Sequence, residues 1–159
     1  STKLKAFPFL STVKSIAVDT TAIDLTVDKN GNPLNFQDGD AFEIVIQVKL
    51  YSPVNRINLR FNNNSISIYK IATNELNYFY TAASHYLSQC STVEVNFINR
   101  EVQGYVINHS KNESGTYGSM YFSFHTENLD ALNIFSIYLY RNTATSNIPA
   151  GTIIIIRRK

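Results

Sequence analysis

The sequence predicts an all-β protein, folded as an antiparallel β-sandwich of two sheets. Three observations lead to this fold class. Apolar and polar residues alternate with a period of two over most of the chain, turn-forming residues separate the alternating runs, and almost no segment has the apolar period of a helix. A series of short strands separated by turns at regular intervals is typical of sandwiches and barrels.

The longest predicted strand covers residues 41–51. One of its faces is entirely apolar and carries Phe42, Ile44, Ile46, Val48 and Leu50. The opposite face is mostly polar, as expected where an antiparallel sheet has one face on the core and the other in water.

The same alternation predicts ten further strands. They cover residues 15–18, 23–27, 56–61, 65–71, 76–80, 92–98, 102–108, 119–125, 135–140 and 152–156. In the run 135–140 we expect Phe135, Ile137 and Leu139 to face the core. The four consecutive isoleucines at 153–156 predict a strand that is covered on both faces. Only 82–89 predicts a helical turn or a short helix.

Turn-forming residues lie between these strands. Asn30-Gly31 and Asp38-Gly39 contain residues that accept a positive φ at low cost, and the three asparagines at 62–64 can serve the same purpose. In the segment 148–151, Pro149 fixes its own φ and Gly151 can take a positive one, so this turn should direct the isoleucine strand back into the sheet beside 135–140.

Length and composition indicate one domain covering residues 1–159. Within it, 1–12 are expected to form an N-terminal arm or a linker to an upstream region. Charged residues make up 16% of the chain and the net charge is +2, while asparagine occurs 18 times. The surface therefore favours hydrogen bonding over charge steering, and we expect no nucleic-acid partner because such domains carry a basic face.

Several other classes are disfavoured. The single cysteine, Cys90, excludes an intrachain disulfide and is expected to be a buried or half-buried thiol. No apolar run reaches the roughly 18 residues of a membrane-spanning helix, so we expect no membrane insertion. The first ten residues lack the pattern of a signal peptide. The basic run 157–159 is expected to be a solvated terminus.

No local motif indicates catalysis, so we expect no enzyme activity, no cofactor and no metal. The three histidines, His85, His109 and His125, lack zinc-site spacing, although a site assembled in space from all three stays open. The acidic residues are scattered along the chain. Alternating oxygens at 28, 30 and 32 could hold a calcium ion, but the EF-hand spacing fails after position 32.

Four tyrosines fall on predicted outward faces: Tyr51, Tyr121, Tyr138 and Tyr140. Such side chains can pair across strands on a wet sheet face, can pack at a subunit interface, or can contact sugar rings. The absence of tryptophan argues against a strong sugar-stacking platform.

Two segments carry a resemblance to a known family. The first reads INLRFNNNS over 57–65 and is followed by Tyr69, and the second pairs IFSIYLY over 134–140 with IPAGTIIII over 148–156. Together they resemble a family of bacteriophage virion domains found in tail, fibre and capsid-attached proteins. In that family an LRFNGD-type segment leads to a tyrosine-containing strand, and an AGS-type turn precedes the last strand.

The match covers about the C-terminal two-thirds of the chain. It departs from the family where Asn63 and Asn64 replace Gly-Asp, where Thr152 replaces Ser, and where 157–159 replace a final Tyr-Gly. The resemblance implies a jelly-roll-like sandwich, and the family's domains are often trimeric.

By this analogy we expect a non-enzymatic virion structural or adhesin domain at a fibre or tail tip. Its expected location is the virion, outside the cell. Its expected partners are two further copies in a homotrimer, other virion proteins and a host cell-surface glycan. The expected glycan-binding residues lie in or beside the loops 62–64, 111–115 and 141–147: Asn62, Asn63, Asn64, Asn112, Tyr117, Tyr138, Tyr140, Arg141 and Asn142.

Two alternatives stay open. A carbohydrate-binding module of a larger enzyme or surface protein would share the sandwich and the polar loops, but would be a monomer with an aromatic platform. An enzyme on a β-sandwich, such as a lyase or depolymerase, would need a cleft in which tyrosine, histidine, arginine or acidic side chains cluster.

Overall fold

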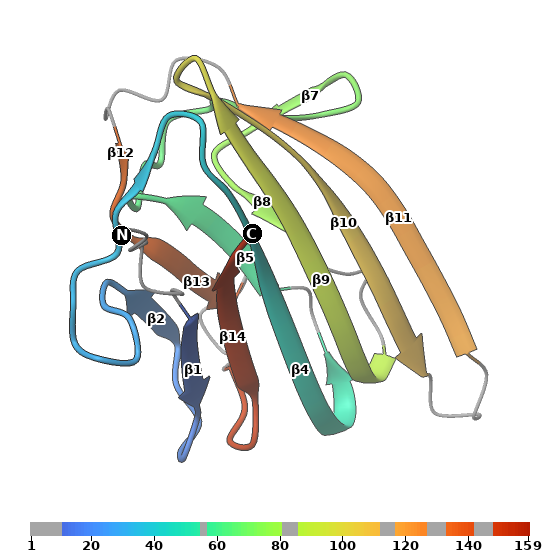
Figure 1. Cartoon of the computed structure of the whole chain (residues 1–159). Helices are drawn as coiled ribbons and strands as arrows, with labels where there is room; N and C mark the ends of the chain where they lie inside the picture. Colours follow the sequence, from blue (N-terminus) through green and yellow to red (C-terminus); the bar gives the residue numbers. More distant parts are fainter. Residues whose placement is uncertain (1–10, 55–56, 81–85, 112–116, 127–132, 142–147) are drawn as a thin grey trace.

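The structure is a computed structural model, and it describes residues 11–54, 57–80, 86–111, 117–126, 133–141 and 148–159. Two antiparallel sheets pack face to face (Figure 1). The larger sheet contains, in spatial order, β1 (Ser11–Ser15), β14 (Ile153–Arg158), β4 (Ala41–Val54), β9 (Tyr86–Ile98), β10 (Glu101–Lys111), β11 (Tyr117–Thr126), β6 (Tyr69–Ile71) and β7 (Asn74–Leu76). The smaller sheet contains β2 (Ala22–Leu25), β13 (Ile137–Arg141), β5 (Ile57–Phe61) and β8 (Phe79–Tyr80). A separate short ladder pairs β3 (Phe36–Gln37) with β12 (Asn133–Ile134).

Eight of these strands form a jelly-roll framework: β1, β2, β4, β5, β8, β9, β13 and β14. Numbered one to eight in chain order, they give sheet orders of 1-8-3-6 and 2-7-4-5. Chain neighbours alternate between the sheets except at the fourth and fifth strands, β5 and β8, which pair within the smaller sheet. These orders are those of a jelly roll made of two Greek keys. The expected antiparallel, jelly-roll-like β-sandwich is confirmed. We call β10, β11, β6 and β7 the extension strands, because they continue the larger sheet beyond β9.

The core lies between the two sheets and is rich in phenylalanine. Phe61 of the smaller sheet packs against Phe79, Phe42 and Phe124, with ring centroids 5.2, 6.4 and 6.5 Å away. Phe79 and Phe124 are stacked at 4.4 Å across the sandwich. The alternation in 41–51 is confirmed through Val48, because Phe42, Ile44, Ile46 and Val48 are all buried.

Residues with positive φ mark the tight turns. Gly39 and Gly151 have φ of 96° and 87°, as the turn chemistry predicts. Asn62 and Asn63 have φ of 55° and 49° and turn the chain after β5. Asparagine tolerates this left-handed conformation better than most residues, so an Asn-Asn pair can replace Asn-Gly here.

The sequence prediction is wrong at five places. The predicted strand 15–18 overlaps β1 only at Ser15, and the predicted strand 76–80 is divided between β7 of the larger sheet and β8 of the smaller sheet. Phe135 is 47% exposed while Ser136 is buried, because the chain leaves β12 at Ile134 and joins the smaller sheet only at Ile137. In 65–71, only Tyr69–Ile71 pairs as a strand. In 82–89, the part from Tyr86 onward belongs to β9 rather than to a helix, and 82–85 lie outside the described residues.

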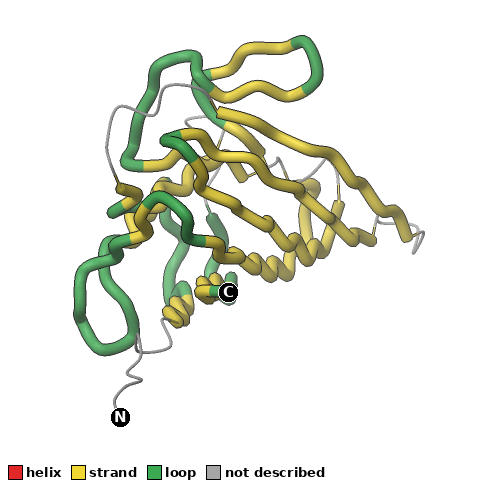
Figure 2. Tube along the Cα trace, turned by 45° about the horizontal axis from the view of Figure 1, so that its top comes forward, coloured by secondary structure: helices red, strands yellow, loops and turns green. Residues whose placement is uncertain are grey.

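The two ends of the domain also differ from the prediction. β1 begins at Ser11, inside the segment expected to be an arm, and residues 1–10 lie outside the described part of the chain. In β14, Ile154 and Ile156 are buried but Ile153 and Ile155 are only partly so, and the expected cover on both faces is therefore incomplete. Among the described residues, strands and loops account for the whole fold (Figure 2), and there is no helix long and apolar enough to cross a membrane.

Candidate functional site

The candidate site lies on the outer face of the larger sheet, where β9 meets the extension strands. Residues 102, 104 and 106 of β10 are buried, so Gln103 and Tyr105 between them point away from the core. On β11, Phe124 faces the core, and Ser123 and His125 face outward by the same alternation. The site is therefore built from the polar face of strands whose other face is core.

A pair of tyrosines forms one wall of the site. Tyr105 and Tyr121 are stacked with ring centroids 5.7 Å apart and ring planes 17° apart, and they remain 42% and 64% exposed. They are diagonal neighbours, because Tyr105 pairs with Ser123 and not with Tyr121. Diagonal aromatic pairs are within reach on one sheet face, and the pair keeps a broad apolar surface in contact with water.

Beside Tyr105 the sheet face is hollowed. This Tyr105 hollow has a volume of about 430 Å³. Its lining residues are Lys70, Ala72, Asn96, Gln103, Gly104, Tyr105, Ser123, Phe124 and His125. The volume is within the range of small-molecule sites. One side of the hollow offers aromatic carbon, and the other sides offer amide, hydroxyl and basic groups. This combination of groups is suited to binding sugars.

The lining of the hollow is neutral to basic. It contains Lys70 and His125 but no acidic residue. Acidic side chains lie just outside, with Glu75 3.4 Å from the Lys70 amine and Glu101 3.8 Å from the His125 imidazole. These ion pairs lie near the surface, where each contributes little to stability. An anionic ligand could therefore replace Glu75 or Glu101 as the partner of Lys70 or His125.

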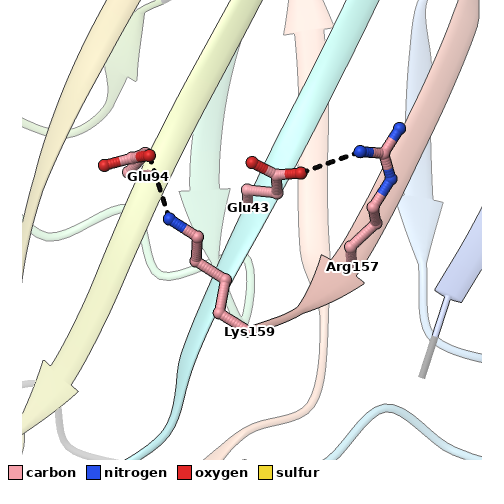
Figure 3. A network of polar contacts seen from close by, with 4 residues as sticks. All are labelled: Glu43, Glu94, Arg157 and Lys159. Atoms are coloured by element: carbon pink, nitrogen blue, oxygen red, sulfur yellow. Dashed lines mark hydrogen bonds and ion pairs between the residues drawn. The ribbon is translucent and has the colours of Figure 1, made fainter. Parts of the chain in front are cut away.

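A network of four charges borders the site on the side of β4 (Figure 3). Glu43 and Glu94 are direct partners across β4 and β9, and such like-charge pairs repel. Arg157 lies 3.0 Å from Glu43, and Lys159 lies 2.9 Å from Glu94. The hydrogen bond and the charge of Glu94 raise the pKa of Lys159. Arg157 and Lys159 of the basic run 157–159 thus offset the repulsion between the two carboxylates. The prediction of a solvated terminus did not include this role.

Within the described ranges, no three side chains of the histidine, cysteine, aspartate and glutamate types are placed to hold a metal ion. His85 lies outside those ranges, so the three-histidine hypothesis is not tested. Cys90 is exposed, contrary to its expected burial, and pairs across β9 and β10 with His109. The arrangement of the hollow suits stacking and hydrogen bonding.

The loop considered for calcium is closed by its own aspartate. One Asp28 carboxylate oxygen accepts hydrogen bonds from the Asn30 and Asn32 backbone N–H groups, at 2.8 and 2.9 Å. Burial raises the pKa of Asp28, but these two bonds, together with the Asn32 side chain and the Lys29 charge, hold the pKa below its ordinary value. The carboxylate therefore fixes the turn at 28–32.

The predicted glycan-binding asparagines at 62–64 have structural contacts. The Asn62 amide oxygen accepts hydrogen bonds from the Phe135 and Ser136 N–H groups, and its nitrogen donates to the Asn133 carbonyl. The Asn64 side-chain oxygen accepts a bond from the Ile66 N–H. Asn63 is exposed at the tip of the turn. These contacts hold the turn against the junction between β12 and β13.

The predicted Tyr138, Tyr140 and Arg141 lie on β13, in the smaller sheet. Tyr138 and Tyr140 are half-buried on its outer face, with centroids 5.6 Å apart, and the Arg60 guanidinium covers the Tyr140 ring at 4.6 Å. Burial raises the pKa of Tyr140, and the Arg60 charge acts against this rise. Arg141 is buried, and burial lowers its pKa.

The structure therefore divides the predicted binding residues. Residues 62–64 lie close to the β12–β13 junction, and Tyr138 and Tyr140 lie in the smaller sheet. The Tyr105 hollow lies on the outer face of the larger sheet. Asn112 and Asn142 lie outside the described residues. Tyr117 begins β11, and only its backbone is described.

Sequence reasoning missed Tyr105, Gln103, Asn96, Ser123 and Lys70 as site residues. A signal was present for Gln103 and Tyr105, because both occupy the alternate positions between buried residues in 102–108. What joins them to Asn96 and Lys70 is strand register, which alternation within one strand does not give. Compared with known proteins, the chain matches no protein-family model and no curated protein.

Proposed function

We propose that this domain is a non-enzymatic bacteriophage virion domain that attaches to a host cell-surface glycan through the Tyr105 hollow. The observation that carries the binding step is the stacked, exposed Tyr105–Tyr121 wall beside a hollow lined by amide, hydroxyl and basic side chains. A tyrosine ring gives a flat apolar surface for a sugar ring, while the neighbouring polar groups bond its hydroxyls.

The virion origin is supported by the motif resemblance and by the positions of the motifs in the fold. The segment 57–65 forms β5 and its turn, and Tyr69 closes that turn through its hydroxyl. The segment 148–156 supplies the Gly151 turn and most of β14, which lies between β1 and β4. In this proposal the domain sits at a fibre or tail tip outside the cell as a homotrimer, in contact with other virion proteins.

A glycan array tests the binding step. We expect the wild-type domain to bind a subset of bacterial surface glycans. Tyr105→Ala should lose at least about tenfold in affinity, because an aromatic contact in a hot spot is worth about 2 kcal/mol or more. The matched variant is Tyr138→Ala, which removes an outward tyrosine from the other sheet. Loss of binding in Tyr138→Ala alone would transfer the site to the smaller sheet, and no binder on the array would refute the adhesin function.

A carbohydrate-binding module of a larger protein is the alternative that the same hollow favours. Such a module works as a monomer, whereas the virion proposal expects three copies. Light scattering of the purified domain separates the two. A stable trimer supports the virion domain, and a monomer that binds glycans with high affinity supports the module.

A further inference from the structure

Four polar side chains form a continuous row across the floor of the Tyr105 hollow. Asn96 on β9 pairs with Gln103 on β10, Gln103 pairs with His125 on β11, and His125 pairs with Lys70 on β6. All four residues line the hollow. Neighbouring strands are about 4.8 Å apart, so three strand spacings give the row a length of roughly 14 Å.

The row runs perpendicular to the strands and has different chemistry at its two ends. At the β9 end the amides of Asn96 and Gln103 offer both donors and acceptors, which suits adjacent hydroxyl groups. At the β6 end His125 and Lys70 supply the basic groups. Tyr105 and Ser123 stand in the next row along the same strands, and Tyr105 provides an apolar wall along the amide half.

An elongated ligand fits this row better than a single terminal sugar. A sugar placed on Tyr105 reaches Gln103 and its neighbours but does not extend over the three strand spacings to Lys70. In an extended polysaccharide each sugar residue advances by about one strand spacing, so successive residues meet successive side chains of the row. The basic end then meets an acidic substituent.

We propose that the hollow binds an internal stretch of an acidic polysaccharide, which crosses β9, β10, β11 and β6 with a carboxylate or phosphate at the His125–Lys70 end. This inference rests on the proposed glycan-binding function and specifies its ligand class. Glu75 and Glu101 hold the two basic groups from outside the lining. These ion pairs are partly exposed, so a ligand anion can compete with the two carboxylates.

Calorimetric titration with defined oligosaccharides tests the length of the ligand. The probes are uronic-acid oligomers of one to five residues, phosphodiester-linked sugar oligomers of the same lengths, and neutral oligomers made by reducing the uronic carboxyl groups. We expect affinity to rise about tenfold or more from one residue to four and then to level off, since a longer chain makes no further contacts. The series that binds more tightly identifies the anion.

Charge is tested with Lys70→Met, and with Lys29→Met as the control from an exposed turn. Lys70→Met should lower affinity for the acidic four-residue oligomer about tenfold, the value of one charge-assisted hydrogen bond, and change affinity for the neutral one less than about twofold. Glu75→Gln, which removes the competing carboxylate, should not weaken acidic binding. Thermal melting confirms that each variant is folded.

The outcomes separate this inference from the function on which it rests. If the wild-type domain binds sugars with an affinity independent of chain length, or if Lys70→Met weakens neutral and acidic oligomers equally, the extended acidic ligand is wrong and the glycan site stands. If no oligomer and no array glycan binds, the proposed function and this inference both fail.

Discussion

Replacing Tyr69 by phenylalanine removes one oxygen atom at the centre of the resemblance motif. The Tyr69 hydroxyl donates to the Asn64 carbonyl and accepts a hydrogen bond from the Phe61 N–H, both at 3.0 Å. The Phe61 N–H points away from β13 and toward Tyr69, because the next residue, Asn62, donates its own N–H to the carbonyl of Ser136, just before β13. Hydrogen-bonded and non-bonded pairs alternate along an antiparallel ladder, so Phe61 and Ile137 form a non-bonded pair.

The cost of Tyr69→Phe follows from these partners. Tyr69 and Phe61 are fully buried, so the Phe61 N–H loses its acceptor where water does not reach it. A stranded buried donor costs about 1–3 kcal/mol. Asn64 is a partly exposed residue, so we expect water to replace the bond that its carbonyl loses. We expect a loss of about 2 kcal/mol in the free energy of unfolding, which is a melting temperature lower by about 4–8 °C for a chain of this size.

Differential scanning calorimetry measures the effect, and Tyr121→Phe is the matched control. Tyr121 undergoes the same chemical change but is 64% exposed on the outer sheet face, where we expect less than about 0.5 kcal/mol. Equal melting temperatures for Tyr69→Phe and wild type would refute the role of this hydroxyl as the anchor of the 62–64 turn.

Three further predictions concern stability. Gly151→Val should destabilise the domain by about 1 kcal/mol or more in urea unfolding, since φ is 87° there while no atom crowds the added side chain, and a denaturation midpoint equal to that of wild type would contradict this account. Gly104→Ala should cost about 1–3 kcal/mol, because the methyl group would meet the Glu94 carbonyl and the Phe124 ring, and a neutral effect would show that β10 shifts freely. Burial raises the pKa of Tyr69 above its unfolded value of 10.0, so folding favours the neutral hydroxyl. The stability from this difference is present below about pH 10 and is lost as the pH rises further. The free energy of unfolding, measured against pH, should therefore fall less at alkaline pH in Tyr69→Phe than in wild type.

Much of the framework follows from local patterns. The alternation over 41–51 gives the buried face of β4, and the turn chemistry gives the positive φ of Gly39 and Gly151. Prediction fails where the chain changes its partner. Phe135 continues the pattern of Ile137 and Leu139, but the strand is interrupted between β12 and β13, which belong to different ladders, so the two-residue period restarts.

The candidate site depends on long-range register and is largely invisible to local patterns. The tight turn at Asn99 and Arg100, with φ of 55° and 64°, joins β9 to β10 and places Gln103 opposite Asn96. Two-residue hairpins with positive φ at both positions usually contain glycine, so this sequence gives only a weak turn signal. The pairing of His125 with Lys70 joins residues more than fifty positions apart in the chain.

The two faces of the extension strands are coupled through Gly104. On the inner side, the Phe124 ring occupies the space where a Gly104 side chain would stand, and it stacks on Phe79 of the smaller sheet at 4.4 Å. On the outer side, the residues flanking Gly104 in the chain are Gln103 and Tyr105, both of which line the hollow. A side chain added at Gly104 would meet the Glu94 carbonyl of β9 and the Phe124 ring of β11, so β10 would have to shift, and Gln103 and Tyr105 would move with it. Outer-face substitutions should therefore reduce glycan binding without lowering the melting temperature, whereas Gly104→Ala should reduce both.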